Sequence, residues 1–216
     1  MNNKTTWIIL AILTAASLVM GLAVYGMLPD QVASHWNARG EADGYSSALS
    51  GVLLLPAIML AVAVLLMFIP VIAPLKENIA AFREDYNAMV IALAGFLIYV
   101  HILTLLFNLG VDFKMNSLLA PGMGGLFFMM GELIGKARRN FFAGIRTPWT
   151  LSSDSVWKKT HERAAMGYKV AGALTLLAIL IPQWAFFFII GPIMAVSLYA
   201  VVYSYLEFER EKAGKA

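Results

Sequence analysis

The chain has 216 residues, of which 60% are hydrophobic and 13% charged; its formal net charge is +3 and its mean hydropathy is +0.75. Soluble domains carry roughly 45–50% apolar and about 25% charged residues, so this composition indicates a membrane protein and excludes a disordered chain. The sequence contains no cysteine, which excludes disulfide scaffolds, thiolate nucleophiles and cysteine-ligated zinc or iron–sulfur sites.

Six apolar stretches follow one another along the chain. A helix that crosses the hydrocarbon core needs about 20 mostly apolar residues. The fourth stretch is the weakest because it contains Pro121 and several glycines, and the last apolar run is long enough that it must turn back at Pro182-Gln183. The sequence therefore predicts an all-α polytopic protein that forms a single membrane domain, with transmembrane helices at about 7–27, 51–73, 88–109, 117–135, 164–182 and 184–206.

Lysine and arginine set the expected orientation, because cytoplasmic flanks are enriched in these residues. With six spans and both termini in the cytoplasm, all of the 16 lysines and arginines except Arg39 and Lys114 lie on the cytoplasmic side. A five-span arrangement separates the charges almost as well, and the length of the apolar segments decides for six. We expect a multi-pass protein of a bacterial or archaeal plasma membrane, with an outer loop at 28–50 and a basic cytoplasmic segment at 136–163.

The outer loop contains two turn signals, Asn37 to Gly40 and Asp43-Gly44, which predict a folded, hairpin-like excursion. His35, Glu41 and Asp43 could supply ligands to a metal ion, and His35 could act as a general base. Their irregular spacing on a turn favours a structural interpretation, in which Asp43 caps a turn, His35 bonds locally and Trp36 lies at the membrane interface. We therefore expect no metal and no other cofactor.

The basic segment interleaves cations with aromatic residues, a mixture that can bind nucleic acid. Beside membrane spans the same mixture fits the anionic cytoplasmic leaflet better, so we expect anionic lipid as a partner and no direct nucleic-acid binding. Thr147-Pro148 forces an extended stretch, after which Ser152 or Ser153 caps a helix that has Asp154 in its first turn. Trp157 and His161 lie four residues apart and share a face of that helix.

Two further candidates for function are ionisable residues that lie inside the spans. His101 lies near the middle of the third span, and Glu132 lies near the cytoplasmic end of the fourth, too far away in depth to pair with it. For Glu132 the simpler interpretation is a local pair with Lys136, four residues later. For His101 it is a neutral ring bonded to a neighbouring helix, and the alternatives are a proton relay or a ligand.

Both loops resemble one known family. The segment LPDQVASHWNARGEADGY from Leu28, followed by NFFAGIRTPWTLSSDSVWKKTH from Asn140, resembles the SdpI family of membrane immunity proteins, and the resemblance extends over almost the whole chain. It implies protection against a secreted peptide toxin and sequestration of a cytoplasmic repressor protein at the membrane. Carried onto this sequence, the outer motif positions, expected to contact the toxin, are His35, Trp36, Gly40 and Asp43. The cytoplasmic motif positions, expected to bind a partner or lipid, are Asn140, Gly144, Arg146, Thr147, Pro148, Trp149, Trp157, Thr160 and His161.

We therefore expect an integral membrane immunity or resistance protein that could also signal by holding a transcriptional repressor at the membrane. The alternative is a small transporter or channel in which His101, Asn108 and the glycine-rich fourth span line a pathway. We expect no enzyme, because no Ser/His/Asp set, HExxH motif or pair of intramembrane carboxylates is present in the sequence.

Overall fold

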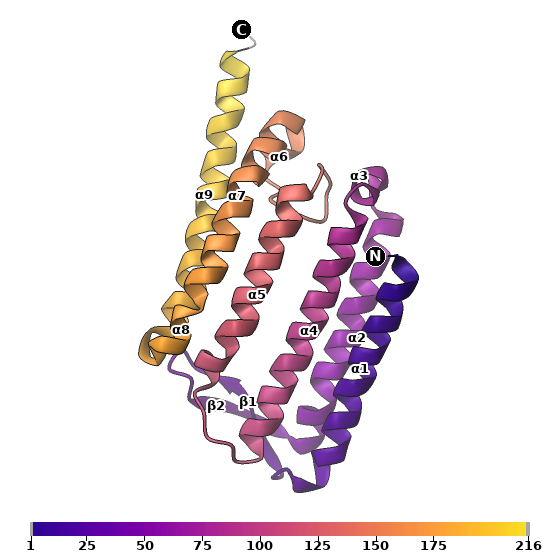
Figure 1. The fold of residues 1–216 in the computed structure, drawn as a ribbon, viewed down its shortest axis with the longest axis vertical. Coiled ribbons are helices and arrows are strands. Elements are labelled where there is room, and N and C mark those ends of the chain that lie inside the picture. Colours follow the sequence, from indigo (N-terminus) through magenta and orange to yellow (C-terminus); the bar gives the residue numbers. More distant parts are fainter. Residues whose placement is uncertain (1, 215–216) are drawn as a thin grey trace.

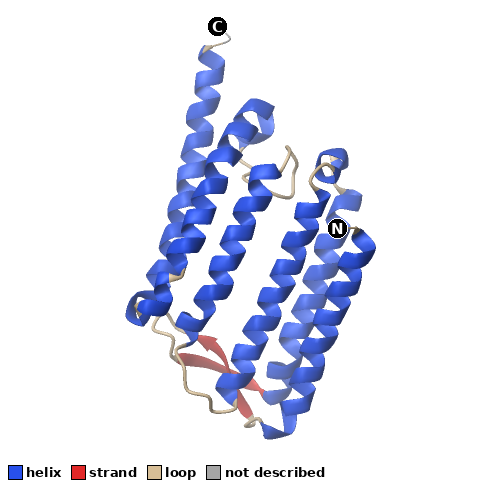
Figure 2. Cartoon of the chain, in the orientation of Figure 1, coloured by secondary structure: helices blue, strands red, loops and turns tan. Residues whose placement is uncertain are grey.

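The computed structural model describes residues 2–214, which form long helices and one two-stranded hairpin (Figures 1 and 2). The elements, in chain order, are α1 (Asn3–Val24), η1 (Tyr25–Met27), β1 (Gln31–Trp36), β2 (Ala42–Ser47), α2 (Ala48–Ile72), α3 (Lys76–Ala80), α4 (Arg83–Asn108), α5 (Met115–Lys136), α6 (Pro148–Ser152), α7 (Asp154–Thr175), α8 (Leu177–Leu180), η2 (Pro182–Trp184) and α9 (Ala185–Ala213).

Six helices are long and apolar enough to cross a membrane: α1, α2, α4, α5, α7 with α8, and α9 with η2. The predicted all-α polytopic fold is therefore confirmed, with the short hairpin as the non-helical exception. The fifth span, expected from about residue 164, continues a helix that begins at Asp154, where the sequence predicts a cap at Ser152 or Ser153. The reason is local, because the Ser153 hydroxyl accepts a hydrogen bond from the Val156 N–H and Asp154 occupies the first turn.

The helices form two groups of three. α1, α2 and α4 pack against one another, α7 packs between α5 and α9, and the two groups meet along α4 and α5 (Figure 1). Both ends of the described chain lie toward the end of the bundle that carries α3 and α6, and the β1–β2 hairpin lies at the opposite end (Figure 1). An even number of crossings requires this arrangement of the termini.

The glycines of the fourth span serve a close helix contact. A Cβ atom on Gly124 of α5 would lie 2.8 Å from the carbonyl oxygen of Gly172 on α7, and one on Gly131 would lie 2.6 Å from that of Ala165. Small residues allow membrane helices to approach this closely and to gain packing energy along their backbones. The composition that weakened the fourth span in the sequence is therefore what joins α5 to α7.

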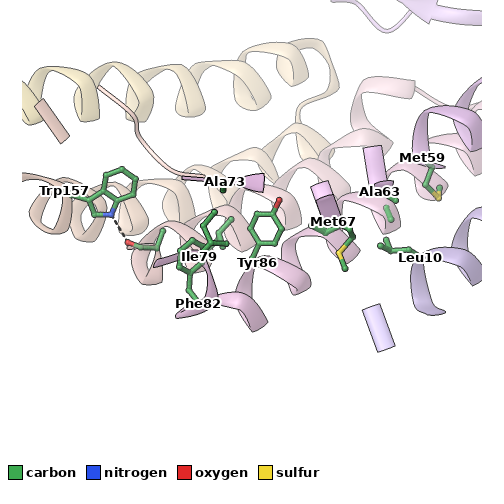
Figure 3. Close-up of a cluster of buried hydrophobic side chains, with 13 residues drawn as sticks. Leu10, Met59, Ala63, Met67, Ala73, Ile79, Phe82, Tyr86 and Trp157 are labelled. Atoms are coloured by element: carbon green, nitrogen blue, oxygen red, sulfur yellow. Dashed lines mark hydrogen bonds between the residues drawn. The ribbon is translucent and has the colours of Figure 1, made fainter. Parts of the chain in front are cut away.

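A row of buried side chains runs along the first group of helices and ends on the second (Figure 3). It starts at Leu10 and Met59 and continues to Ile79 and Phe82, near the end of the bundle opposite the hairpin. There Trp157 of α7, which is 2% exposed, belongs to the same cluster. Trp157 therefore ties the two groups together at this end.

The absence of cysteine makes the arrangement of the two ends directly testable. Ser34 in β1 and Ser155 in the first turn of α7 are both exposed. We expect Ser34→Cys to react with a membrane-impermeant thiol reagent added to intact cells, and Ser155→Cys to react only after the cells are permeabilised. Labelling of both variants in intact cells, or of neither, would contradict the six-span arrangement.

Candidate functional site

The hairpin at one end of the bundle is closed by a tight turn. The Asn37 N–H donates to the carbonyl of Glu41 at 2.9 Å, and Gly40 adopts a φ of +77°, which favours glycine. The Glu41 carboxylate accepts hydrogen bonds from the Asn37 amide at 2.9 Å and from Arg39 at 3.0 Å. These bonds hold the pKa of Glu41 below its usual value. The turn is thus ordered by its own side chains.

His35 and Asp43 form a pair on the exposed side of the hairpin. The His35 Nδ1 and Asp43 Oδ1 atoms are 2.5 Å apart, and the two side chains are 71% and 43% exposed. Glu41 takes no part, because it is bonded to Asn37 and Arg39. Among residues 2–214, no group of three His, Cys, Asp or Glu side chains is placed to hold a metal ion.

The other two outer motif positions face the helices. The half-buried Trp36 ring meets Phe107 of α4 edge to face, with 5.3 Å between ring centroids. Gly40 is buried beside Asn116 of α5. The structure therefore divides the predicted outer positions into an exposed pair and two positions that dock the hairpin.

Two asparagines that the motifs did not include anchor the hairpin. The Asn108 Oδ1 atom accepts from the Ala33 N–H at 2.7 Å, and its Nδ2 donates to the Ala33 carbonyl at 3.0 Å. Asn116 donates from Nδ2 to the carbonyls of Ala38 at 2.9 Å and Asn37 at 3.3 Å. Asn108 ends α4 and Asn116 begins α5, so the hairpin bridges the two groups of helices. The only sequence signal for these anchors is an amide side chain beside an apolar run. The sequence analysis named Asn108 only as a residue that could line a transport pathway.

At the other end, Asn140 organises the loop after α5. Its side chain is fully buried, and its Nδ2 donates to the carbonyls of Arg138 at 2.8 Å and Ala143 at 2.9 Å. Its Oδ1 accepts from the N–H groups of Phe142 at 2.8 Å and Ala143 at 2.7 Å. One side chain thus satisfies four backbone groups, which leaves it no capacity for an external ligand.

Gly144, Trp157 and His161 lie together under this loop. The buried His161 ring accepts at Nε2 from the Ile145 N–H at 3.0 Å, donates from Nδ1 to the Trp157 carbonyl at 2.7 Å, and stacks on the Trp157 ring with centroids 3.9 Å apart. The Trp157 Nε1 donates to the Ala137 carbonyl at 2.8 Å (Figure 3). Gly144 has a φ of +112°, and a Cβ there would lie 2.5 Å from the His161 Nε2 atom.

Thr147 of the cytoplasmic motif forms a capping box with Thr150. Thr147 caps α6 by accepting from the Thr150 N–H, and Thr150 accepts in return from the Thr147 N–H and donates to the Ile145 carbonyl. The Thr147 hydroxyl also lies 3.0 Å from that of Ser204 on α9. Pro148 occupies the first helical position, where its missing N–H is not needed.

The remaining motif residues differ in exposure. Arg146 is exposed and donates from Nη1 to the Phe141 carbonyl at 2.7 Å. Trp149 is half-buried against the ring of Tyr205, with centroids 5.1 Å apart. Thr160 is fully buried, and its hydroxyl has no hydrogen-bond partner within residues 2–214. Most of the cytoplasmic motif therefore builds the loop, and few of its side chains reach the surface.

The two intramembrane candidates are both paired within the bundle. His101 is fully buried, and its Nδ1 lies 2.7 Å from the Ser17 hydroxyl on α1. The Glu132 carboxylate lies 2.5 Å from Lys169 Nζ on α7 and 4.0 Å from Lys136 Nζ. The longer contact, between Glu132 and Lys136, is the pair that the i,i+4 spacing predicts. Lys136 lies closer to Asp85 of α4, at 2.6 Å, so an ion network links α4, α5 and α7.

Two cavities border the cytoplasmic motif. A polar one of about 580 Å³ is lined by four basic side chains together with Trp157 and His161, and one of those cations, Arg139, is paired with Asp154 at 2.7 Å. A largely apolar one of about 330 Å³ lies between the two groups of helices and is bordered by residues 142–145.

Segments at both ends of the bundle are similar to known protein families. Residues 136–204 match the SdpI/YfhL protein family, and residues 12–60 match a domain of unknown function, DUF1648. The chain is also 25% identical over 165 residues to the immunity protein SdpI of Bacillus subtilis (strain 168), which covers 76% of this chain and 77% of that protein. No solved structure matches the chain. The resemblance to the SdpI family is thereby confirmed, and the matched segments hold the hairpin and the motif loop.

The contact between Gly144 and His161 makes a sharp prediction. We expect Gly144→Ala to destabilise the protein by about 1–3 kcal/mol, because the new Cβ collides with the His161 ring and the residue must keep a positive φ. Gly125→Ala is the matched control, since nothing lies within 4 Å of its Cβ position. Thermal unfolding in detergent, followed by tryptophan fluorescence, measures both. Equal melting temperatures would show that the loop tolerates a side chain at residue 144.

The Asn108 anchor makes a second prediction. Asn108→Asp keeps an acceptor for the Ala33 N–H but removes the donor to the Ala33 carbonyl. Ala33 is 2% exposed, so water does not replace this donor. Leaving a buried carbonyl without a partner costs about 1–3 kcal/mol, so we expect amides of β1 to exchange with deuterium at least about fivefold faster. Amides of α2 provide the internal reference. Unchanged exchange in β1 would exclude Asn108 as the anchor.

Proposed function

We propose that this protein is a multi-pass plasma-membrane immunity protein that protects its cell against a secreted peptide toxin. The similarity to an immunity protein over 76% of the chain carries the proposal, since it extends from the first matched segment into the second. The charge distribution supports an orientation in which both termini and the motif loop are cytoplasmic and the hairpin faces outward. On the hairpin, His35 and Asp43 are the motif residues free to meet a ligand in water.

A signalling role is the second part of the proposal. α5 begins at Met115, next to the hairpin anchor Asn116, and ends at Lys136, beside Ala137, whose carbonyl is bonded to Trp157. A change in the hairpin would therefore be passed by one continuous helix to the motif loop. At that end Arg138, Phe141 and Arg146 are exposed and could hold a cytoplasmic repressor protein or anionic lipid.

The geometry of the motif histidine supports a non-enzymatic role. Both ring nitrogens of His161 are occupied by backbone partners, and the ring is 1% exposed, so it is not placed to move protons for a substrate. The buried bond between His101 and Ser17 likewise favours helix packing over a transport pathway. His101→Leu tests the transporter alternative, because full protection by this variant would contradict a pathway that needs His101.

Protection can be measured in a toxin-sensitive strain that lacks its own immunity gene, grown with a toxin-producing strain. We expect the chain to restore survival, and we expect His35→Gln with Asp43→Asn to lose most of this protection at equal membrane abundance. The pair Arg138→Gln with Phe141→Ala, at the opposite end, should keep protection and lose recruitment of a cytoplasmic partner. A loss of both activities only in proportion to protein level, in both double variants, would contradict the assignment of separate ends.

A further inference from the structure

The outward edge of β2 carries main-chain groups that the described chain leaves without a partner. In the hairpin Ala33 lies opposite Tyr45. The N–H and carbonyl of Ala33 are bonded to Asn108 and not to Tyr45. In an antiparallel ladder, opposed residues that do not bond to each other point their N–H and carbonyl groups away from each other. The N–H and carbonyl of Tyr45 therefore point away from β1.

The ladder is irregular on both sides of His35, but the register from Asp30 to Ala33 agrees with this assignment. The Ala48 N–H donates to the Asp30 carbonyl at 3.2 Å, which marks a hydrogen-bonded position. Such positions recur every second residue, so Val32 with Ser46 bonds across the ladder and Gln31 with Ser47 does not. The Ser47 N–H thus points to the same edge as Tyr45, while the Ser47 carbonyl, at the N-cap of α2, accepts the first bond of that helix. The Tyr45 residue is 61% exposed, so this edge is accessible to water.

We propose that the edge of β2 binds an extended segment of a cationic peptide by strand addition. An edge strand with free N–H and carbonyl groups is a template for an extended chain, which gains affinity through main-chain hydrogen bonds. The inference rests on the proposed immunity function in one respect, because it takes the bound segment to be part of the secreted toxin.

Charge and side-chain pattern define the segment that fits. Along β2 the side chains of Asp43, Tyr45 and Ser47 are exposed in alternation with less exposed neighbours. The nearby positive charge of Arg39 is engaged by Glu41 at 3.0 Å, which leaves the Asp43 carboxylate and its His35 partner beside the edge. A basic residue beside Asp43 and an apolar or β-branched residue against the Tyr45 ring would complement this surface.

The anchoring of the hairpin favours binding. β1 is held to α4 through Asn108, and the turn is held to α5 through Asn116, so the strand that receives the peptide is already ordered. A preorganised edge avoids the entropy cost of ordering the hairpin on binding. The edge is also continuous with the exposed His35–Asp43 pair, so strand addition and recognition of a basic side chain occur together.

The probe for the test is a synthetic, end-blocked peptide of alternating lysine and valine, measured by fluorescence anisotropy on the full chain in phosphatidylcholine nanodiscs. We expect saturable binding above that of empty nanodiscs. Methylation of alternate backbone nitrogens, or replacement of lysine by glutamate, should weaken binding by about tenfold or more, because the first removes strand donors and the second repels Asp43. Equal binding of the methylated peptide would overturn strand addition.

Variants at one residue separate the main chain from the side chain. Tyr45→Pro removes an N–H that faces outward and no bond of the ladder, so it should weaken probe binding by about tenfold or more. Tyr45→Ala keeps the N–H and should weaken binding no more than about threefold. Hydrogen exchange of β1 checks that the hairpin persists. If proline disturbs the hairpin, a backbone ester in place of the Tyr45 amide removes the same N–H without the proline ring and is tested instead. Equal effects of alanine and proline, or of alanine and the ester, would overturn the proposal.

The protection assay distinguishes failure of strand addition from failure of the proposed immunity function. Loss of both probe binding and protection in Tyr45→Pro supports strand addition of the toxin. Full protection by Tyr45→Pro would overturn the toxin as the occupant and leave the immunity function standing. If the unmodified chain gives no protection but binds the probe in a Tyr45-dependent manner, the immunity function fails and the peptide-binding edge stands.

Discussion

Backbone N–H and carbonyl groups that leave a helix and are buried must find partners within the protein, because a buried polar group without a partner costs free energy. This chain leaves its helices in two structured segments, the hairpin at one end and the loop 137–147 at the other. Asn108 and Asn116 satisfy the first, and Asn140 and His161 satisfy much of the second. The rest of the molecule depends on these bonds, since they fix where helices end and how the two groups of helices are joined.

This constraint changes the meaning of the cytoplasmic motif. Its asparagine, threonines and histidine are residue types that bind ligands, yet they are buried and their polar atoms mostly serve the chain itself. The requirement for glycine at residue 144 follows from the same packing, because the His161 ring occupies the space of a side chain. The motif thereby holds a few exposed residues, among them Phe141 and Arg146, in a defined position at the end of the bundle.

The two groups of helices meet along α4 and α5, and further contacts join them at both ends of the bundle. The hairpin spans the start of α5 and the end of α4, while Trp157 and the ion network through Lys136 join the groups at the motif end. The apolar cavity of about 330 Å³ lies between the groups beside the motif loop. Because α5 contacts the hairpin at one end and borders this cavity at the other, it connects the two ends, which supports the proposed coupling of toxin recognition to signalling.

The sequence by itself determined the membrane class and the six helices, because apolar composition over about 20 residues is a local property that the bilayer converts directly into structure. It also predicted a helix start capped by Ser152 or Ser153, and Ser153 is the cap. Only the tertiary structure decided that Asn108 binds a strand, that Lys169 is the partner of Glu132, and that no other strand of residues 2–214 pairs with the outer edge of β2. These facts depend on which segments meet in space, and no spacing along the chain encodes a contact between residues 75 positions apart, such as Ala33 and Asn108.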